Sequence, residues 1–388
     1  MKVEHIITRF IIGGAQENTL STVLGLREIP GVNVTLVTGP TTGPEGSLEP
    51  VARKIPGLLE LEPCLTRPVS PARDILCLIS LVRRFRRTRP DIVHTHIGKA
   101  GILGRLAAKL TGVPHIVHGI HGPTFGNFQG ALANLVFTNV ERLAGRCTEH
   151  FIVVANAMRD QYLAAGIGTP EQYTRVFSGF KLEPYLQSEN DLQLRAKLGL
   201  RPDDIVVGKI ARLFPLKGHD KLFDAAPEII RRNPRIKFLL VGDGILREKF
   251  QRQVAEMGIA DHFIFAGLVP PEQIASMTGI IDILVHLSYR EGLPRVLPQA
   301  LASGKPVIAF DCDGAKEVCV TGKTGILVPL GDTRKLQEAI CQLAAAPELR
   351  QQLGQNGRNY VAERFTEAEM VRKTYQIYTR LMGRNTKN

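Results

Sequence analysis

Short apolar runs alternate along the first half of the chain with longer segments in which apolar residues recur at helical spacing. The runs are short enough to be strands and lie at 3–7, 32–37, 92–94, 115–118 and 151–154. The segments with helical spacing run from the loop 13–18 to residue 26 and then cover 73–87, 99–111, 128–146 and 157–165. This alternation predicts right-handed crossovers and a parallel sheet with helices on both faces.

The same pattern starts again in the second half of the chain. Strands are expected at 205–210, 238–241, 263–265, 281–287 and 307–309. Helices are expected near 219–232, 246–256, 271–278, 294–303, 333–345 and 347–363. A last helix over about 367–381 has a broad apolar side and no strand of its own.

These elements predict an α/β protein with two Rossmann-like domains that face each other across a cleft. The boundaries predicted are 1–180 for the first domain, 181–202 for a polar linker and 203–365 for the second domain. A helix and tail at 366–388 complete the chain, and we expect this helix to cross back to the first domain.

Composition narrows the class of protein. A length of 388 residues with 44% hydrophobic content allows two cores. The six cysteines form no CxxC pair, which disfavours disulfide frameworks and zinc sites and favours a reducing, cytoplasmic setting. No apolar run is long enough to span a bilayer, and Met1 leads into a short strand without a secretory signal.

A net charge of +12 predicts attraction to polyanions such as phosphorylated metabolites, acidic lipid headgroups or nucleic acid. The densest basic run, 83–89, ends a predicted helix and suggests docking on an anionic membrane, at the inner face of the cell membrane. Nucleic acid is disfavoured as a partner because aromatic residues make up only 6% of the chain and no reader motif occurs.

Candidate chemistry gathers where the strand 281–287 ends. Glu291 and Gly292 follow that strand directly, and a helix is expected to begin beside them. The carboxyl ends of parallel strands are where ligands bind, and a helix N-terminus offers amide donors to a phosphate. The stretch therefore predicts a pocket for a polyol and a phosphate, although a capping role for Glu291 would explain the same residues.

Two further strand ends offer anion-binding groups. Arg212 and Lys217 flank a proline turn after the strand 205–210, and Gly218 precedes the next helix. Two cations there could hold a diphosphate leaving group, whereas the alternative is a pair of solvated charges. Gly13 and Gly14 follow the first strand and supply amides close to a ligand, or simply make a tight turn.

Histidines follow two strands of the first half, as His94 with His96 and His118 with His121. The first member of each pair falls within its strand, where packing or hydrogen bonding is expected. The second member, His96 or His121, falls at the strand end and can face a cleft. Two loose pairs are weak evidence for a metal site, so no metal is expected.

Two other glycine motifs do not complete the nucleotide-binding patterns that they resemble. The segment 320–324 resembles the end of a Walker A loop, but Glu317 stands where the first glycine is needed. Gly242 begins a GxGxxG pattern that Arg247 breaks, although Gly242 can still place a turn beside a nucleotide.

Together these pieces resemble the retaining glycosyltransferases of family 4, which have the GT-B fold. The resemblance is closest to bacterial enzymes that build surface polysaccharides or lipopolysaccharide. The matching pieces, in order, are 13–16, 94–101, 118–122, 208–218, 241–244, 291–300 with 304–307, and 322–331.

The resemblance implies a metal-free enzyme without a cofactor that binds a nucleotide-diphosphate sugar mostly through its second domain. Arg212 and Lys217 would hold the diphosphate, and His121 would lie near the reacting centre. Residue 299 matches the second glutamate of the family's E-x7-E pattern, which holds the ribose. Other residues implied in donor contacts are Glu291, the backbone at Gly292, Leu293, Pro294 and Arg295, and Gly13, Gly14 and Gly242. On the acceptor side the matching residues are His96 and Lys99.

The chain departs from the family pattern at two positions. Gln299 replaces the glutamate, so the ribose contact loses its charge. Pro294 removes one amide donor where the family often has glycine, and Arg295 is expected to compensate.

The function expected is transfer of a sugar, with retention, to a saccharide or lipid-linked acceptor in cell-surface polysaccharide or lipopolysaccharide synthesis. Gln299 leaves open a partner subunit that binds the nucleotide sugar without catalysis. A GT-B nucleotide-sugar epimerase is a further alternative.

Overall fold

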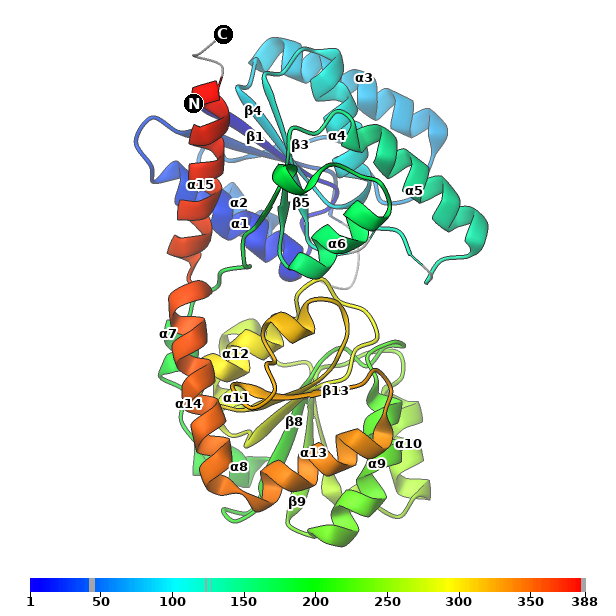
Figure 1. Ribbon diagram of the computed structural model, residues 1–388, viewed down its shortest axis with the longest axis vertical. Helices are drawn as coiled ribbons and strands as arrows, with labels where there is room; N and C mark the ends of the chain where they lie inside the picture. Colours follow the sequence, from blue (N-terminus) through cyan, green and yellow to red (C-terminus); the bar gives the residue numbers. More distant parts are fainter. Residues whose placement is uncertain (42–45, 123, 127, 385–388) are drawn as a thin grey trace. The chain divides into compact units, whose positions relative to one another are not determined.

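The computed structural model describes residues 1–41, 46–122, 124–126 and 128–384, and the chain divides into two compact units (Figure 1). The first unit consists of Met1–Phe180 with Glu367–Asn388, and the second of Lys181–Thr366. The last four residues of the expected tail, 385–388, lie outside the described residues.

The first unit is built on a seven-stranded parallel sheet in the order β3-β2-β1-β4-β5-β6-β7. Its strands are β1 (Lys2–Ile7), β2 (Asn33–Thr38), β3 (Leu59–Leu61), β4 (Ile92–His96), β5 (His115–Ile120), β6 (His150–Val153) and β7 (Tyr173–Arg175). Residues on β1, β4 and β5 are almost all buried, because helices cover both faces of the sheet.

Two groups of helices cover this sheet. The helices are α1 (Gly14–Arg27), α2 (Glu49–Arg53), α3 (Pro71–Thr88), α4 (Gly98–Leu110), α5 (Ala131–Gly145), α6 (Asn156–Ala164) and α15 (Glu367–Arg384). Helices α1 and α15 share one apolar cluster with the sheet, in which Val23 and Leu26 lie with Val371 and Tyr378. Helices α3 and α4 share a second apolar cluster, and α5 lies beside α4 (Figure 1).

The second unit is built on a six-stranded parallel sheet in the order β10-β9-β8-β11-β12-β13. The strands are β8 (Ile205–Ile210), β9 (Ile236–Val241), β10 (Phe263–Gly267), β11 (Ile283–His286), β12 (Val307–Phe310) and β13 (Gly325–Val328). The helices are α7 (Glu183–Leu186), α8 (Leu192–Lys197), α9 (His219–Arg232), α10 (Arg247–Glu256), α11 (Ile274–Gly279), α12 (Val296–Ala302), α13 (Thr333–Ala345) and α14 (Pro347–Arg364). One apolar cluster joins α9, α10 and α13 to the sheet.

The doubly wound α/β architecture and the return of the last helix to the first unit are confirmed. The sequence pattern missed β3, β7 and β13, which have three or four residues each. The segment expected as a linker, 181–202, carries α7 and α8 and belongs to the second unit. No helix of the described chain has both the length and the apolar character needed to cross a bilayer.

Candidate active site

The carboxyl edge of the second sheet brings together the loops that follow β8 and β11. Leu216 and Gly218 both have positive φ, at 65° and 66°, and this turns the loop after β8 back toward β11. The Tyr289 N–H donates to the Leu216 carbonyl at 2.9 Å. A Cβ at Gly218 would lie 2.0 Å from the Leu287 carbonyl oxygen, so only glycine permits this approach.

This approach joins Lys217 to Glu291. Their side chains form an ion pair that is partly exposed, and the Ser288 hydroxyl donates to the same carboxylate at 3.4 Å. The Glu291 N–H donates to the Asp313 carboxylate at 2.8 Å, so the loop after β12 also supports the site. Both groups of the pair remain accessible to an incoming ligand, because each keeps more than a fifth of its side chain exposed.

Arg212 lies on the same loop as Lys217 and is exposed. Its guanidinium carbon lies 4.9 Å from the centre of the Phe214 ring, a cation–π contact that orients the side chain. Gly242, after β9, approaches this loop so closely that a Cβ there would lie 2.2 Å from the Ala211 carbonyl oxygen. The two cations expected from the sequence therefore follow β8 on one loop, within a single edge of the sheet.

Three buried basic side chains lie behind this edge. Lys209 is fully buried within β8, and its Nζ has no hydrogen-bond partner among the described residues. The pKa of Lys209 is lowered to about 7, chiefly by burial and also by the charge of Lys217, while Asp220 and Glu291 oppose the shift. Burial also lowers the pKa of His219 to about 2 and that of His286 well below its ordinary value, with Lys209 and Lys217 contributing to both. Lys209 and Lys217 thus place positive charge close to both histidines at this edge of the sheet.

The stretch after Glu291 differs from the expectation in one respect. Helix α12 begins at Val296 and not at 294, so Gly292, Leu293 and Pro294 form a buried loop before it. The proline ring fixes this loop, and the Gly314 N–H donates to the Gly292 carbonyl at 3.1 Å. Arg295 is the cap residue of α12, and Gln299 lies one turn into the helix and is half-buried.

In the first unit, Gly13 and Gly14 lie where α1 begins. Gly13 is the N-cap residue, and no side chain of the described residues caps the helix there. A Cβ at Gly13 would lie 3.0 Å from the Gln16 side-chain oxygen. The first amides of this 14-residue helix therefore have no side-chain acceptor from the cap and are suited to an anion.

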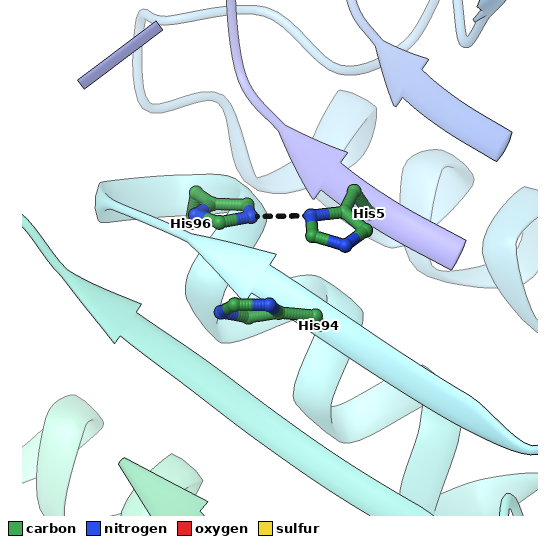
Figure 2. Close-up of side chains that lie close together, drawn as sticks. All are labelled: His5, His94 and His96. Atoms are coloured by element: carbon green, nitrogen blue, oxygen red, sulfur yellow. Dashed lines mark hydrogen bonds between the residues drawn. The ribbon is translucent and has the colours of Figure 1, made fainter. Parts of the chain in front are cut away.

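A chain of buried polar side chains ends at the half-buried His121. His121 Nε2 lies 3.0 Å from His96 Nδ1, and His96 Nε2 lies 2.9 Å from His5 Nδ1. Figure 2 shows the His5–His96 bond between β1 and β4, with the ring of His94 beside it. The hydroxyl of Tyr378, on α15, lies 3.2 Å from His5 Nε2 and 2.6 Å from His94 Nδ1.

Burial keeps these histidines neutral. It lowers the pKa of His5 to about 3 and that of His121 to about 4, and it lowers the pKa values of His94 and His96 well below their ordinary range. One ring nitrogen from each of His5, His94 and His96 lies within 4.8 Å of the others, a spacing that a metal ion could also use. Hydrogen bonds already engage both nitrogens of His5 and His96.

The structure corrects two expectations for the acceptor-side residues. His96 does not face outward at its strand end, because it is 1% exposed and both of its nitrogens contact other histidines. Lys99 is mostly buried and forms an ion pair with Asp74 at 2.6 Å. The arginines of the basic run 83–89 do not all face solvent, because Arg84 is buried in ion pairs with Glu4 and Glu60.

Sequence reasoning missed Lys209, Asp313, His5 and Tyr378. Lys209 is a lysine inside an otherwise apolar strand, and that signal was available. His5 and Tyr378 are 373 residues apart, and nothing in the local sequence of either indicates the other.

Family models and relatives agree on the kind of protein. The model described as "Glycosyl transferases group 1" matches residues 190–360, and the model "Glycosyltransferase Family 4" matches residues 12–179. The chain is 30% identical to the UDP-Gal:alpha-D-GlcNAc-diphosphoundecaprenol alpha-1,3-galactosyltransferase of Escherichia coli, over 81% of this chain and 82% of that enzyme. It is 23% identical to the capsular polysaccharide biosynthesis glycosyltransferase CapM of Staphylococcus aureus, over 81% and 83% of the two chains.

A solved structure shares the fold. The crystal structure of Anabaena HepE in complex with UDP superposes with a TM-score of 0.83 at 21% identity, covering 98% of this chain and 100% of HepE. The same protein in complex with UDP-glucose gives a TM-score of 0.80 over 98% and 99% of the two chains.

Proposed function

The chain belongs to the family 4 type of GT-B glycosyltransferases, and from this premise we propose that it transfers a hexose with retention from a uridine diphosphate sugar. The observation that carries the proposal is the Lys217–Glu291 pair beside the exposed Arg212, at an electropositive sheet edge. Such an edge suits a diphosphate, and the carboxylate suits the hydroxyls of a sugar. The UDP-Gal, UDP and UDP-glucose named with the relatives support the choice of donor.

In this proposal Arg212 and Lys217 bind the diphosphate and stabilise the charge that develops as it leaves. Glu291 binds the transferred sugar, with the backbone from Gly292 to Arg295, and Gln299 accepts a hydrogen bond from the ribose. Gly242 lies beside the nucleotide.

We propose that the amides at Gly13 and Gly14 contact the phosphates and that His121 lies near the reacting centre. The bond between the sugar's anomeric carbon and the phosphate oxygen breaks, and the acceptor oxygen bonds to the same face of that carbon. The acceptor's proton passes to the departing phosphate. No metal or cofactor is proposed for these steps, since Arg212 and Lys217 supply the positive charge.

For the acceptor we propose a saccharide or a lipid-linked saccharide. The diphosphoundecaprenol in the E. coli relative's name and the capsule in the S. aureus relative's name support this class. Lys99 and the neighbouring α4 N-terminus are the acceptor-side candidates, while His96 would act through His121.

We also propose that the acceptor is met at the cytoplasmic face of the membrane, through the outer face of α3 and α5. Both helices lie on the same side of the first unit (Figure 1). Helix α5 exposes an apolar stripe at helical spacing, formed by Leu132 (76% exposed), Leu135 (58%), Val136 (51%) and Leu143 (52%). Helix α3 exposes Ile75, Leu76 and Ile79 in its first half and Arg83, Arg86 and Arg87 in its second half.

The charge on this face favours an anionic bilayer. Within 67–89 and 128–146, all of which the structure describes, no aspartate or glutamate is exposed. Asp74 pairs with Lys99, and Glu141 is buried against Arg105 at 2.7 Å. Apolar side chains flanked by arginines are typical of a surface that binds acidic headgroups and inserts shallowly.

Donor turnover tests the main proposal. The protein is incubated with a panel of sugar nucleotides and a lipid-diphosphate sugar acceptor, and release of nucleoside diphosphate is measured. We expect a uridine donor to be turned over and Arg212→Ala or Lys217→Ala to lower kcat about 100-fold or more. Donor binding without turnover would instead identify a non-catalytic subunit, and a changed sugar without acceptor would identify an epimerase.

Vesicle sedimentation tests the membrane surface separately. We expect binding to phosphatidylglycerol-rich vesicles and none to pure phosphatidylcholine. Replacing Arg83, Arg86 and Arg87 by glutamine should weaken binding about 100-fold, and Leu135→Asp should abolish insertion. Leu268→Asp, at an exposed leucine of the second unit, is the matched control. Equal binding by the arginine variant and the natural chain would rule this surface out.

A further inference from the structure

The hydrogen-bond chain from α15 to His121 has only one proton arrangement that leaves no buried donor unpaired. A neutral imidazole has one N–H and one lone pair, and a tyrosine hydroxyl has one proton to donate. Four contacts connect the chain, in the order His94, Tyr378, His5, His96 and His121. Each contact needs a single proton, so the residue that donates in the first contact determines which residue donates in each of the others.

His94 Nε2 decides between the arrangements, because it is buried and has no hydrogen-bond partner in the part of the chain that the structure describes. If Tyr378 donated to His94 Nδ1, His94 would carry its proton on Nε2, where no described residue accepts it. If Tyr378 accepted from both His94 and His5, its own hydroxyl proton would be unpaired. A buried donor without an acceptor is rarer in proteins than an acceptor with a free lone pair.

The remaining arrangement runs in one direction. His94 Nδ1–H donates to Tyr378, and Tyr378 donates to His5 Nε2. His5 Nδ1–H then donates to His96 Nε2, and His96 Nδ1–H donates to His121 Nε2. His121 must therefore carry its own proton on Nδ1.

We propose that Tyr378 and His5 are positioning residues that act through His96 to hold His121 in one ring orientation and in its Nδ1–H tautomer. The inference rests on the proposed role of His121 near the reacting centre. It assigns to the C-terminal helix a part in arranging that centre, because Tyr378 is the only link of the chain that lies outside the sheet and its loops.

Packing around Gly119 holds three rings of the hydrogen-bond chain close together. Gly119 pairs with His96 across β4 and β5. A Cβ at Gly119 would lie 2.8 Å from His96 Nδ1, 3.1 Å from His94 Nε2 and 3.2 Å from His121 Nε2. Three imidazoles thus converge over a residue without a side chain, and any larger residue would push them apart.

The direct test is the tautomer of His121, read by two-bond ¹H–¹⁵N correlation on protein labelled with ¹⁵N-histidine. We expect the natural chain to show His121 as a single neutral species with its proton on Nδ1. His5→Asn supplies an amide donor near the former Nδ1 and should retain this state, whereas His5→Leu should give a mixture of tautomers. A proton on His121 Nε2 in the natural chain would overturn the proposal.

Tyr378→Phe has a matched control on the same helix. It removes the hydroxyl and keeps the packing of the ring, so we expect the His121 signals to broaden or double. Tyr375→Phe changes a tyrosine one turn earlier whose hydroxyl is not part of the chain, and it should leave those signals unchanged. Identical spectra for the two variants would contradict the inference.

Kinetics provide a second measurement. His5→Leu and Tyr378→Phe should lower kcat up to about 100-fold, with the KM for the donor within about twofold of the natural value. His5→Asn should recover most of kcat. If neither the natural protein nor any variant turns over a donor, the proposed function is wrong. The tautomer measurement still decides whether the hydrogen bonds from Tyr378 to His121 have the direction proposed.

Elemental analysis distinguishes the proton chain from a metal site. We expect no zinc, nickel or copper in the purified protein, and no change in the histidine signals when zinc is added. One bound equivalent that shifts His5, His94 and His96 would overturn the proton chain, because those lone pairs would then serve the ion.

Discussion

Lys209 is a buried lysine without a partner among the described residues, and this makes it a source of instability in the second unit. Its pKa of about 7 in the folded protein lies below that of the unfolded chain, so the unfolded chain binds more protons above pH 7. The loss of stability is therefore largest near and below pH 7 and shrinks as the pH rises toward 10.

We predict that Lys209→Met raises the free energy of unfolding at pH 7 by about 2–4 kcal/mol. Urea unfolding at pH 7 and at pH 9.5 measures the effect, and the gain should be smaller at the higher pH. The same variant should bind a nucleoside diphosphate more weakly, because the positive field at the sheet edge falls. Lys249→Met, at an exposed position of α10, is the control and should change neither quantity. A destabilised Lys209→Met protein would show that the amine has a role in folding.

Gln299 stands where the family pattern has a glutamate, so a substitution can restore the negative charge at this position. We predict that Gln299→Glu binds UDP about fivefold more tightly, since a carboxylate accepts a ribose hydroxyl more strongly than an amide does. Gln299→Ala should bind more weakly than the natural chain. Isothermal titration of the three forms measures this series, and an unchanged affinity for the glutamate would exclude a ribose contact at position 299.

At the scale of elements, the conformation of the loop after β8 depends on the close approach between Gly218 and the Leu287 carbonyl. Gly218→Ala would add left-handed strain and also force a Cβ against the Leu287 carbonyl. Gly258 has a similar φ of 69° but open space around it, so Gly258→Ala adds the strain alone. We predict that Gly258→Ala costs about 1 kcal/mol of stability.

Gly218→Ala should cost several times as much and should also abolish donor binding, because Lys217 would move away from Glu291. Urea unfolding and UDP titration of both variants test this pair. Equal losses of stability in the two variants would mean that the backbone at Leu287 shifts to make room for the new Cβ at little cost in free energy.

The alternation of apolar runs was sufficient to predict most elements, because parallel strands buried on both faces read as continuous apolar runs. It failed for β3 and β7 because each has only three residues, too few for a periodic signal. It placed the start of α12 two residues early, since Pro294 is an acceptable first helical residue in sequence but lies in the buried loop before the helix.

The places of three candidate residues at one sheet edge could be predicted from topology alone. Arg212, Lys217 and Glu291 follow strands, and the ends of parallel strands gather at one edge. Asp313 could not be anticipated, because its contact with the Glu291 N–H depends on a positive φ of 47° at a residue other than glycine. The same limit applies to Tyr378, whose partner His5 lies at the other end of the chain.

At the scale of the whole molecule, buried histidines make stability depend on pH. Seven histidines have pKa values lowered chiefly by burial, and they are His5, His94, His96, His118, His121, His219 and His286. Their ordinary value is 6.5, and His5 and His121 fall to about 3 and 4. Between pH 4 and 6.5 the unfolded chain therefore binds more protons than the folded chain, so stability rises with pH in that window and is lost as pH falls.

We predict a marked fall in the urea midpoint between pH 6.5 and pH 5, since even two such groups contribute up to about 2.7 kcal/mol per pH unit once the unfolded histidines are protonated. The upper part of this window lies well above the ordinary pKa values of aspartate and glutamate, so there the slope reports chiefly the histidines. The ring of His219 lies beside that of Phe250, and its two nitrogens have no partners among the described residues, so His219→Phe removes one titrating group without removing a hydrogen bond. That variant should be more stable at pH 5 and should show a shallower dependence on pH. A flat urea midpoint from pH 6.5 to pH 5 in the natural chain would mean that these imidazoles take up protons in the folded state, through water that reaches them without unfolding.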